Sequence, residues 1–168
     1  AQRAGVTRGA VYWHFRNKAD LFNATMQPLR LPLDEMVAGL IADTITDPID
    51  QLREAIYPVL ERLRTDESYQ RLFIIWFHRI ENASELEIIA GKQRDTERHR
   101  EVVLQLFERA QRQGQLRESV TPASAELAIR LLLIGLYTEW LRDTSRFDIS
   151  VEGRAAVEAL LSGLLRCR

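Results

Sequence analysis

The chain has 168 residues, of which 46% are hydrophobic and 28% charged, so it is long and apolar enough to bury a substantial core. Its single cysteine, Cys167, excludes an internal disulfide and favours a reducing cytoplasm as the location. The longest apolar run, Leu131 to Tyr137, is far shorter than the ~20 residues that cross a bilayer, so no membrane segment is expected.

Positive charge is concentrated at the N-terminus. Residues 1–30 contain five Arg or Lys and one acid, a net charge of +4, which leaves −5 for the rest of a chain whose total is −1. This asymmetry agrees with contact to nucleic acid but is weak support by itself.

The first predicted element is a short helix that follows a tight turn. Gly5 permits the positive φ of a sharp bend, and Thr7 is a suitable N-cap for a helix that starts at about Arg8. Gly9 has no side chain, so the backbone of this helix can approach a grooved partner closely. Lys18 opens the next helix, where its ammonium and the first backbone N–H groups are suited to holding a phosphate.

This segment closely resembles the helix-turn-helix signature of the TetR family of transcriptional repressors, which reads Thr-x-Gly-x-x-Tyr-x-x-Phe-x-x-Lys-x-x-Leu. The matching residues are Thr7, Gly9, Tyr12, Phe15, Lys18 and Leu21. Residues 6–15 look most like the AcrR-like and TtgR-like subgroup, the regulators of multidrug efflux pumps. The resemblance implies base or groove contacts from Arg8, Gly9 and Tyr12, and phosphate contacts from Thr7, Trp13, His14 and Lys18. The alternative is that the aromatic side chains only pack the small domain.

The resemblance also implies how the chain is divided. Residues 1–24 correspond to the C-terminal part of the DNA-binding head, and residues 25–168 to the ligand-binding and dimerisation domain of an all-α, TetR-type fold. A helix-turn-helix needs a first helix to brace the second. We therefore expect further helices ahead of Ala1, and poor DNA binding by this chain alone.

Helical periodicity dominates the rest of the chain, and no strand is expected. A connecting helix begins at about Lys18 and runs to the early forties, kinked or interrupted at Pro28 and Pro32. Further helices are predicted over residues 47–65, 67–80, 85–113 and 121–142, with a last one after Ser150.

Two of these helices carry informative side chains. Residues 72–77 are apolar all the way round, which places them at the centre of the body. Residues 92–101 are charged and are interpreted as a solvated face with local pairs such as Asp95 to Arg98.

Residues 127–137 are apolar on every side apart from Arg130 and Gly135, so their helix needs cover on two faces. One face of this helix can pack against the core. The helix and the leucine-rich last helix can form an antiparallel pair, and this pair can dock on the same pair of a second copy of the chain. We therefore expect a homodimer through residues 122–142 and 151–168, which matches a palindromic operator in double-stranded DNA. The resemblance implies the same dimer. The alternative is that both faces are buried within one subunit.

The aromatic segment has the composition of a small-molecule site. Phe73, Trp76 and Phe77 offer apolar contacts, and His78 and Glu81 lie three residues apart on one helix surface. From periodicity alone, a packed core with a structural His78–Glu81 pair is the simpler interpretation. The resemblance favours a lipophilic effector, because drug-responsive repressors of the subgroup carry a similar His-x-x-Glu step and bind such compounds inside the body. The candidate ligand-binding residues are then Met26, Leu29, Ile56, Leu60, Phe73, Trp76, Phe77, His78, Glu81, Ile134 and Tyr137.

Enzyme chemistry is not expected. The three histidines are scattered, and neither paired catalytic carboxylates nor a glycine-rich phosphate loop is found, so no catalytic residue, cofactor or metal site is predicted. The sequence predicts a cytoplasmic repressor that releases operator DNA when a lipophilic molecule binds, in control of a multidrug efflux operon. The alternatives are a repressor of the same fold that senses a fatty acid or other metabolite, and a helical protein–protein dimerisation module without a ligand.

Overall fold

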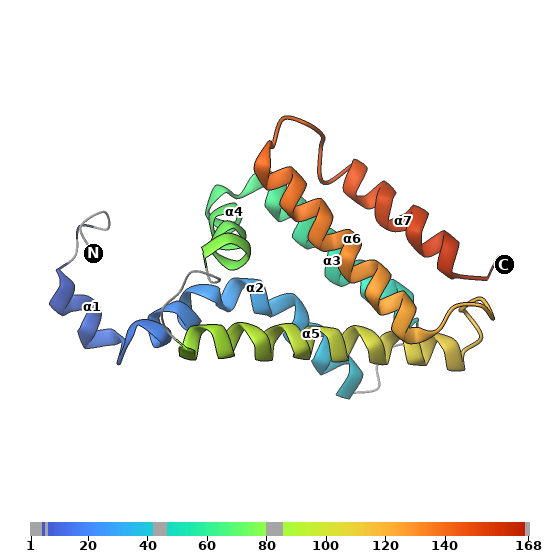
Figure 1. Ribbon diagram of the computed structural model, residues 1–168, viewed down its shortest axis with the longest axis horizontal. Coiled ribbons are helices and arrows are strands. Elements are labelled where there is room, and N and C mark those ends of the chain that lie inside the picture. The colour runs from blue at the N-terminus through green and yellow to red at the C-terminus, as the bar shows by residue number, and fades with distance from the viewer. Residues whose placement is uncertain (1–4, 6, 42–46, 80–85, 167–168) are drawn as a thin grey trace.

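The computed structural model describes residues 5, 7–41, 47–79 and 86–166, which are predominantly helical (Figure 1). Within these ranges the β-structure is limited to an isolated antiparallel bridge between Leu116 and Leu165. The predicted all-α fold is confirmed. The helices are α1 (Arg8–His14), α2 (Lys18–Ile41), α3 (Pro48–Thr65), α4 (Glu67–Ile74), the π-helix η2 (Ile75–Arg79), α5 (Leu86–Arg112), α6 (Pro122–Arg142) and α7 (Glu152–Leu164).

Helix α1 projects from one end of the molecule, and α2 connects it to the body (Figure 1). Helix α5 contacts α2, α3 and α6, so it links the connector to the rest of the body. Helices α6 and α7 form an antiparallel pair on the side of the body away from α2 (Figure 1). Among the described residues, no helix combines the length and hydropathy needed to cross a membrane.

Local signals fix where several body helices begin and end. The carboxylate of Asp47 accepts the N–H groups of Ile49 and Asp50 at 2.8 and 3.2 Å, with Pro48 at the first helical position. Thr121 caps α6 by accepting the N–H of Ser124 at 3.2 Å. Gly114, with a φ of 71°, follows the end of α5. The helix starts predicted at residues 47 and 121 are confirmed, and the helix end predicted at residue 113 lies one residue beyond the observed end of α5.

The core lies where α3, α4, α5, α6 and α7 meet. Burial of each large apolar side chain there contributes about 1.5–3 kcal/mol to the stability of the fold, so these side chains supply most of the free energy that stabilises the body. The large side chains that are almost completely buried include Leu60, Leu63, Tyr69, Leu106, Phe107, Ile129, Val157 and Leu161.

Two predicted elements differ from the structure. The connector is a single helix over Lys18–Ile41. Of the two forms predicted at Pro28 and Pro32, a kink or an interruption, the interruption is wrong and the kink stays a prediction; a proline removes one helical hydrogen bond without necessarily ending the helix. The helix predicted over residues 67–80 is α4 followed by the π-helix η2. A π turn contains an extra residue, so it changes the directions in which the aromatic side chains point.

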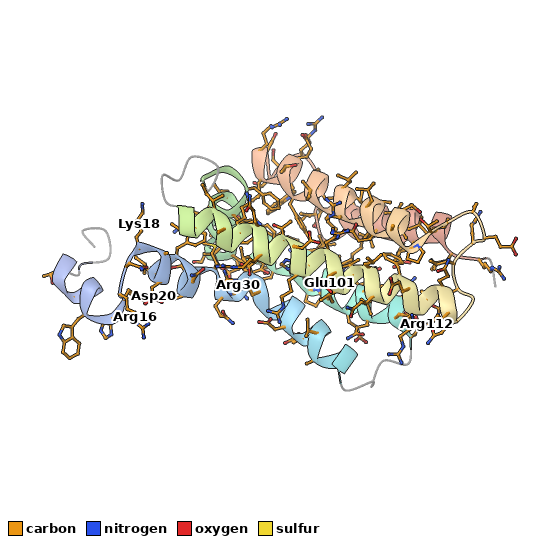
Figure 2. All side chains as sticks on the ribbon, turned by 60° about the horizontal axis from the view of Figure 1, so that its bottom comes forward. Arg16, Lys18, Asp20, Arg30, Glu101 and Arg112 are labelled. Carbon is orange, nitrogen blue, oxygen red and sulfur yellow. The ribbon has the colours of Figure 1, made fainter. Side chains whose placement is uncertain are left out.

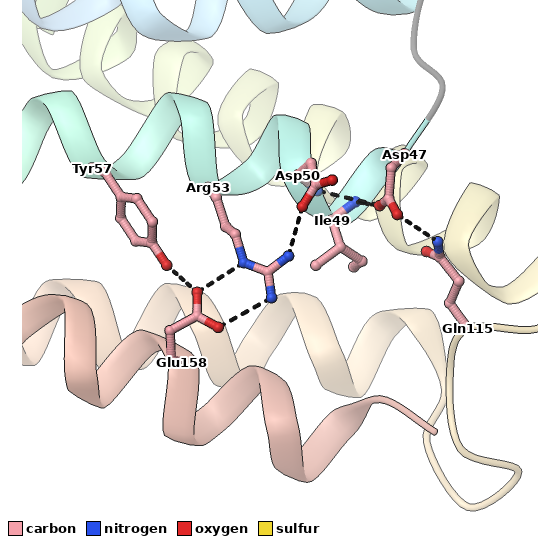
Figure 3. Close-up of polar contacts among 7 residues, drawn as sticks. All are labelled: Asp47, Ile49, Asp50, Arg53, Tyr57, Gln115 and Glu158. Atoms are coloured by element: carbon pink, nitrogen blue, oxygen red, sulfur yellow. Dashed lines mark hydrogen bonds and ion pairs between the residues drawn. The ribbon is translucent and has the colours of Figure 1, made fainter. Parts of the chain in front are cut away.

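Polar side chains fix α7 on α3 (Figure 3). Arg53 Nε donates to Glu158 Oε1 at 2.8 Å, Arg53 Nη2 donates to Glu158 Oε2 at 3.1 Å, and the Tyr57 hydroxyl also donates to this carboxylate. Arg53 Nη1 donates to Asp50 at 2.8 Å, which orients the guanidinium. The hydrogen bonds from Arg53 hold the pKa of Glu158 below its ordinary value, so the carboxylate stays ionised.

The segment after α7 is also tied down. The backbone N–H of Arg166 donates to the carbonyl of Gln115 at 2.8 Å, and the N–H of Arg117 donates to the carbonyl of Leu164 at 3.1 Å. The Gln115 side chain in turn donates to Asp47 at 3.1 Å (Figure 3). The position of α7 is therefore set by both the start of α3 and the loop between α5 and α6.

Candidate DNA-binding helix and ligand-binding core

The described residues of helix α1, which are Gly9, Ala10, Trp13 and His14, are exposed to solvent. Thr7 Oγ1 accepts the N–H of Ala10 at 3.1 Å, and Gly5 has the positive φ, 64°, that the preceding turn requires. Among the described residues, a Cβ added at Gly9 would come within 4 Å only of Thr7 Oγ1, at 3.9 Å, so they leave the backbone open to close approach there. Trp13 is 89% exposed, which is not compatible with a packing role against the described residues.

The remaining predicted DNA-contact residues are less completely defined. His14 is exposed at the end of α1, with its ring edge-on to Trp13 and the ring centroids 6.2 Å apart. Arg8 and Tyr12 lie in α1 by their backbone, and their side chains are outside the described residues. Lys18 begins α2 and is exposed (Figure 2). Five of the seven predicted residues can therefore be placed in full on or beside this helix.

The start of α2 differs in one respect from the phosphate site that the sequence predicts. Asn17 Oδ1 accepts the N–H of Asp20 at 2.8 Å, and Asp20 Oδ2 accepts the N–H of Arg16 at 3.1 Å. This reciprocal cap occupies one of the helix N–H groups and places a carboxylate nearby. A phosphate at this end would therefore depend more on the Lys18 ammonium than on the helix terminus.

In the body, Phe73, Phe77 and Tyr137 form an aromatic cluster between α4, η2 and α6. The ring centroids of Phe73 and Tyr137 are 5.0 Å apart at 74°, an edge-to-face contact, and Phe77 lies 6.0 Å from Phe73 and 6.3 Å from Tyr137. Burial raises the pKa of Tyr137 far above its ordinary value, so its hydroxyl stays protonated. Three of the predicted ligand-binding residues are thus brought together from distant parts of the sequence.

Four further predicted residues lie on α2 and α3. Ile56 and Leu60 belong to the core cluster that contains Phe73 and Tyr137, and Leu29 packs partly buried against it. Met26 is 0% exposed but does not belong to that cluster of described residues. These positions lie inside the body, as a site for a lipophilic molecule requires.

Trp76 lies elsewhere. Its side chain packs against the cluster of Ala19, at the start of α2, and Ile88, near the start of α5, and Phe22 packs against the same cluster. The Lys92 ammonium lies 6.0 Å from the Trp76 ring centroid. Adjacent residues of η2 therefore face two clusters: Trp76 the junction between head and body, and Phe77 the core. Consecutive side chains of a helix point in different directions, so this aromatic segment contacts both regions.

Two other parts of the predicted site are not assembled in the structure. Ile134 is 36% exposed on the outer surface of α6 rather than inside the aromatic cluster. His78 lies in η2 by its backbone, but its side chain and the whole of Glu81 are outside the described residues. The His78–Glu81 pair stays a prediction.

The outer surface of α6 and α7 is apolar. Leu127, Leu131 and Ile134, spaced for one face of α6, are 45%, 55% and 36% exposed. Ala155, Ala159 and Gly163 are exposed at four-residue spacing on α7, so another helix can approach closely there. We call these six residues the outer apolar face.

A shallow hollow of about 380 Å³ lies apart from the predicted site, beside the α6–α7 loop. It is mostly polar, and no predicted ligand-binding residue lines it. Its lining consists of Arg64, Gln70, Trp140, Thr144, Ser145, Phe147 and Asp148.

Comparison with known proteins identifies the family to which the chain belongs. Residues 1–25 match the bacterial regulatory proteins of the tetR family, and residues 47–165 match the C-terminal region of the MAATS-type transcriptional repressors. The chain is 32% identical to the HTH-type transcriptional regulator AcrR of Shigella flexneri, over 99% of its own length and 78% of AcrR. The chain belongs to the TetR family.

Solved structures agree with this assignment. NalD, the secondary repressor of the MexAB-OprM multidrug efflux pump in Pseudomonas aeruginosa, superimposes with a TM-score of 0.84 at 35% identity, covering all of this chain and 85% of NalD. The complex of SmeT with triclosan gives a TM-score of 0.84 at 25% identity, over 98% of this chain and 79% of SmeT. SmeT is the repressor of the Stenotrophomonas maltophilia efflux pump SmeDEF. This TetR-family chain is therefore a transcriptional regulator and not an enzyme, as predicted.

The contacts that hold the connector of this TetR-family chain are not visible in the sequence. The predicted local pair between Asp95 and Arg98 is wrong: Asp95 pairs with Arg30 at 2.5 Å, and Arg98 pairs with Asp34 at 3.1 Å. Both partners lie on α2. The i,i+3 spacing of Asp95 and Arg98 indicated a local interaction, and no local pattern reports a partner 65 residues away.

Proposed function

We propose that the full-length protein is a homodimeric repressor of a multidrug efflux operon, and that it leaves its operator when a lipophilic effector binds the body. The observation that carries the proposal is the presence, in one chain, of an exposed capped helix and a buried aromatic cluster. The similarity to repressors of efflux pumps over nearly the whole chain supports it.

In this proposal, residues 1–24 belong to the DNA-binding head and residues 25–168 to the effector-binding and dimerisation domain. Helix α1 enters the major groove, where Gly9 permits close approach and Arg8 and Tyr12 contact the groove. The exposed tips of Trp13 and His14, the Thr7 hydroxyl and the Lys18 ammonium contact phosphates. Binding should then weaken steeply with salt, because phosphate contacts release counterions.

The outer apolar face is the proposed dimer interface. Exposed leucine side chains on α6 beside small residues on α7 allow each copy to cover the other, and a symmetric pair of helices gives a four-helix contact. The polar contacts between Glu158 and Arg53 fix α7 on its own subunit, so the interface is presented as a rigid surface.

The effector site is proposed at the aromatic cluster, with Phe73, Phe77 and Tyr137 as the apolar wall and the buried residues of α2 and α3 around it. The rings touch one another, so an effector has to separate them. That movement would displace α4 and η2, which contact α2, and so couple the effector to the head.

A binding assay tests the proposal. Fluorescence anisotropy with the promoter fragment next to the gene should give tight, salt-dependent binding by the full-length protein, and weak binding to a scrambled duplex of equal length. Triclosan, which is bound to SmeT in the complex above, is the first probe for release. Release by a long-chain fatty acid in place of drug-like compounds would support the metabolite-sensing alternative. Equal affinity for both duplexes, together with a stable dimer, would favour the dimerisation module.

A further inference from the structure

The connector α2 and the body helix α5 run side by side in the same direction, and their contacts form an ordered series (Figures 1 and 2). The series begins with buried apolar packing near the head, where Ala19 packs with Ile88, and continues with the ion pairs of Arg30 with Asp95 and of Asp34 with Arg98 toward the far end of α2. Between them Asn23 lies close to Gly91, where an added Cβ would be 3.8 Å from Asn23 Oδ1.

Arg30 makes the most extensive contact of this series. Its Nε donates to Asp95 Oδ2 at 2.8 Å, and its Nη2 lies 2.5 Å from the same oxygen. The guanidinium also reaches back along α2: Nη1 donates to the carbonyl of Asn23 and Nη2 to Asn23 Oδ1, both at 3.2 Å. One planar group therefore joins two points of the connector to α5.

Pro28 lies between those two points. Proline lacks the N–H that would bond the carbonyl of Ala24, so this turn of α2 has one helical hydrogen bond fewer and bends more easily. Arg30 follows Pro28 and Asn23 precedes it, so the guanidinium spans the weakened turn. It holds the turn from the side that faces α5.

The degree of burial distinguishes this ion pair from its neighbours. The side chains of Arg30 and Asp95 are 18% and 19% exposed, whereas those of Arg98 and Asp34 are 51% and 36% exposed. Exposed ion pairs are screened by water and contribute little to holding two helices together. The Arg30–Asp95 pair is shielded and oriented by further hydrogen bonds, so of the two described ion pairs between α2 and α5 it is the one that more strongly resists movement of α2.

We propose that Arg30 and Asp95 form a latch that holds the connector in its operator-binding arrangement, and that effector binding has to open it. This inference rests on the proposed function. The latch is closed while Phe73, Phe77 and Tyr137 touch one another, and an effector separates those rings. Arg30 and Asp95 are positioning residues: neither lies on α1 or in the aromatic cluster.

Two substitutions in the full-length protein test the latch. Arg30→Met removes a positive charge and Asp95→Asn removes a negative charge. If net charge alone set the affinity for DNA, Arg30→Met would lower it and Asp95→Asn would raise it. Loss of the latch predicts the same direction for both: operator affinity falls at least about fivefold, the lower end of typical coupling between sites. The double variant should lose no more than either single variant, because the contact is already gone.

Two further readouts separate positioning from a direct DNA contact or general damage. The slope of affinity against salt should stay unchanged in Arg30→Met, because a lost phosphate contact would reduce it by about one unit. With a spin label at Ala10→Cys, in a Cys167→Ser background, the distance between the two heads of the dimer should be broadened or shifted in both variants. The matched control is Arg71→Met, which removes the same charge from an exposed pair with Glu67 and should leave affinity and distances unchanged.

The outcomes are distinguishable. Variants that match the wild type in operator affinity and head distance would overturn the latch while leaving the proposed function intact. Opposite effects of Arg30→Met and Asp95→Asn would also overturn it. A wild-type protein that does not bind its operator would overturn the proposed function, and the latch with it.

Discussion

Leu131→Ala tests the surface through which we propose that two copies associate. Leu131 is 55% exposed in the single chain and lies between Leu127 and Ile134 on the outer apolar face. Full burial of a leucine side chain is worth about 1.5–3 kcal/mol, so covering the exposed part contributes about 0.8–1.6 kcal/mol in each copy. A symmetric dimer contains this contact twice. Because about 1.4 kcal/mol changes an equilibrium tenfold, we expect the dimer Kd to rise roughly 10- to 200-fold.

Sedimentation velocity over a dilution series measures this Kd directly. The substitution should not lower the melting temperature of the monomer much, because alanine is a good helix former and about half of the leucine is already in water. Gln93→Ala, an exposed position on α5, is the control for truncation of a long side chain outside the face and should leave the Kd unchanged. An unchanged Kd for Leu131→Ala would refute this assignment of the interface.

Three more substitutions have defined outcomes. Glu158→Gln should lower the free energy of unfolding at neutral pH by about 1 kcal/mol or less, since Glu158 is 42% exposed and its pairing with Arg53 is screened by water. The pKa of Glu158 is lowered in the folded state, so the ionised carboxylate adds to the free energy of unfolding above the unfolded pKa, and this stabilisation is lost as pH falls through the folded pKa. In urea titrations, the difference in the free energy of unfolding between Glu158→Gln and the wild type should therefore shrink below about pH 4. Trp13→Ala should weaken operator binding in a gel shift without changing the melting temperature, and equal affinity would argue against a DNA contact by this 89% exposed side chain. Leu106→Ala should lower the free energy of unfolding by about 2–5 kcal/mol in urea, because Leu106 is 0% exposed; a loss below about 1 kcal/mol would contradict its place in the core.

The parts of the fold that the sequence predicts well are those with local causes. Asp47 with Pro48, and Thr121 with Pro122, carry their helix starts within a few residues, since a cap and an N-terminal proline act on the first turn alone. The apolar stripe of α7 follows helical spacing, so Val157 and Leu161 are buried as that pattern indicates.

Features that depend on distant residues were not accessible in this way. A segment that is apolar all round has no polar face, so periodicity could not say that Phe77 packs against Tyr137 while Trp76 packs against Ala19 and Ile88. The π-helix in this segment also has no signal in composition. The sequence did indicate the exposed helix α1, because its motif is local.

The charged middle of α5 shows the same limit. Asp95 and Arg98 have a spacing that suits a local pair, but each is also within reach of a helix that lies alongside. Once α2 is placed beside α5, Arg30 supplies Asp95 with a partner that is better shielded from water than a local pair on an open face, and Arg98 pairs with Asp34 on α2. Tertiary placement, and not propensity, decides between these pairings.

The partial burial of the Arg30–Asp95 pair suits a protein in which effector binding and operator binding favour different arrangements of the connector. An effector shifts the equilibrium only by the difference in its affinity for the two arrangements. Separating Phe73 from Tyr137 forfeits about 0.5–1.5 kcal/mol beyond area burial, which the apolar contacts of the effector replace. Breaking a fully buried ion pair would cost about 3–5 kcal/mol, above the typical coupling of about 1–3 kcal/mol, while an exposed pair contributes about 0–1 kcal/mol. At 18% and 19% exposure the latch lies between these limits, so it is strong enough to fix the connector and weak enough for a lipophilic molecule of modest affinity to open.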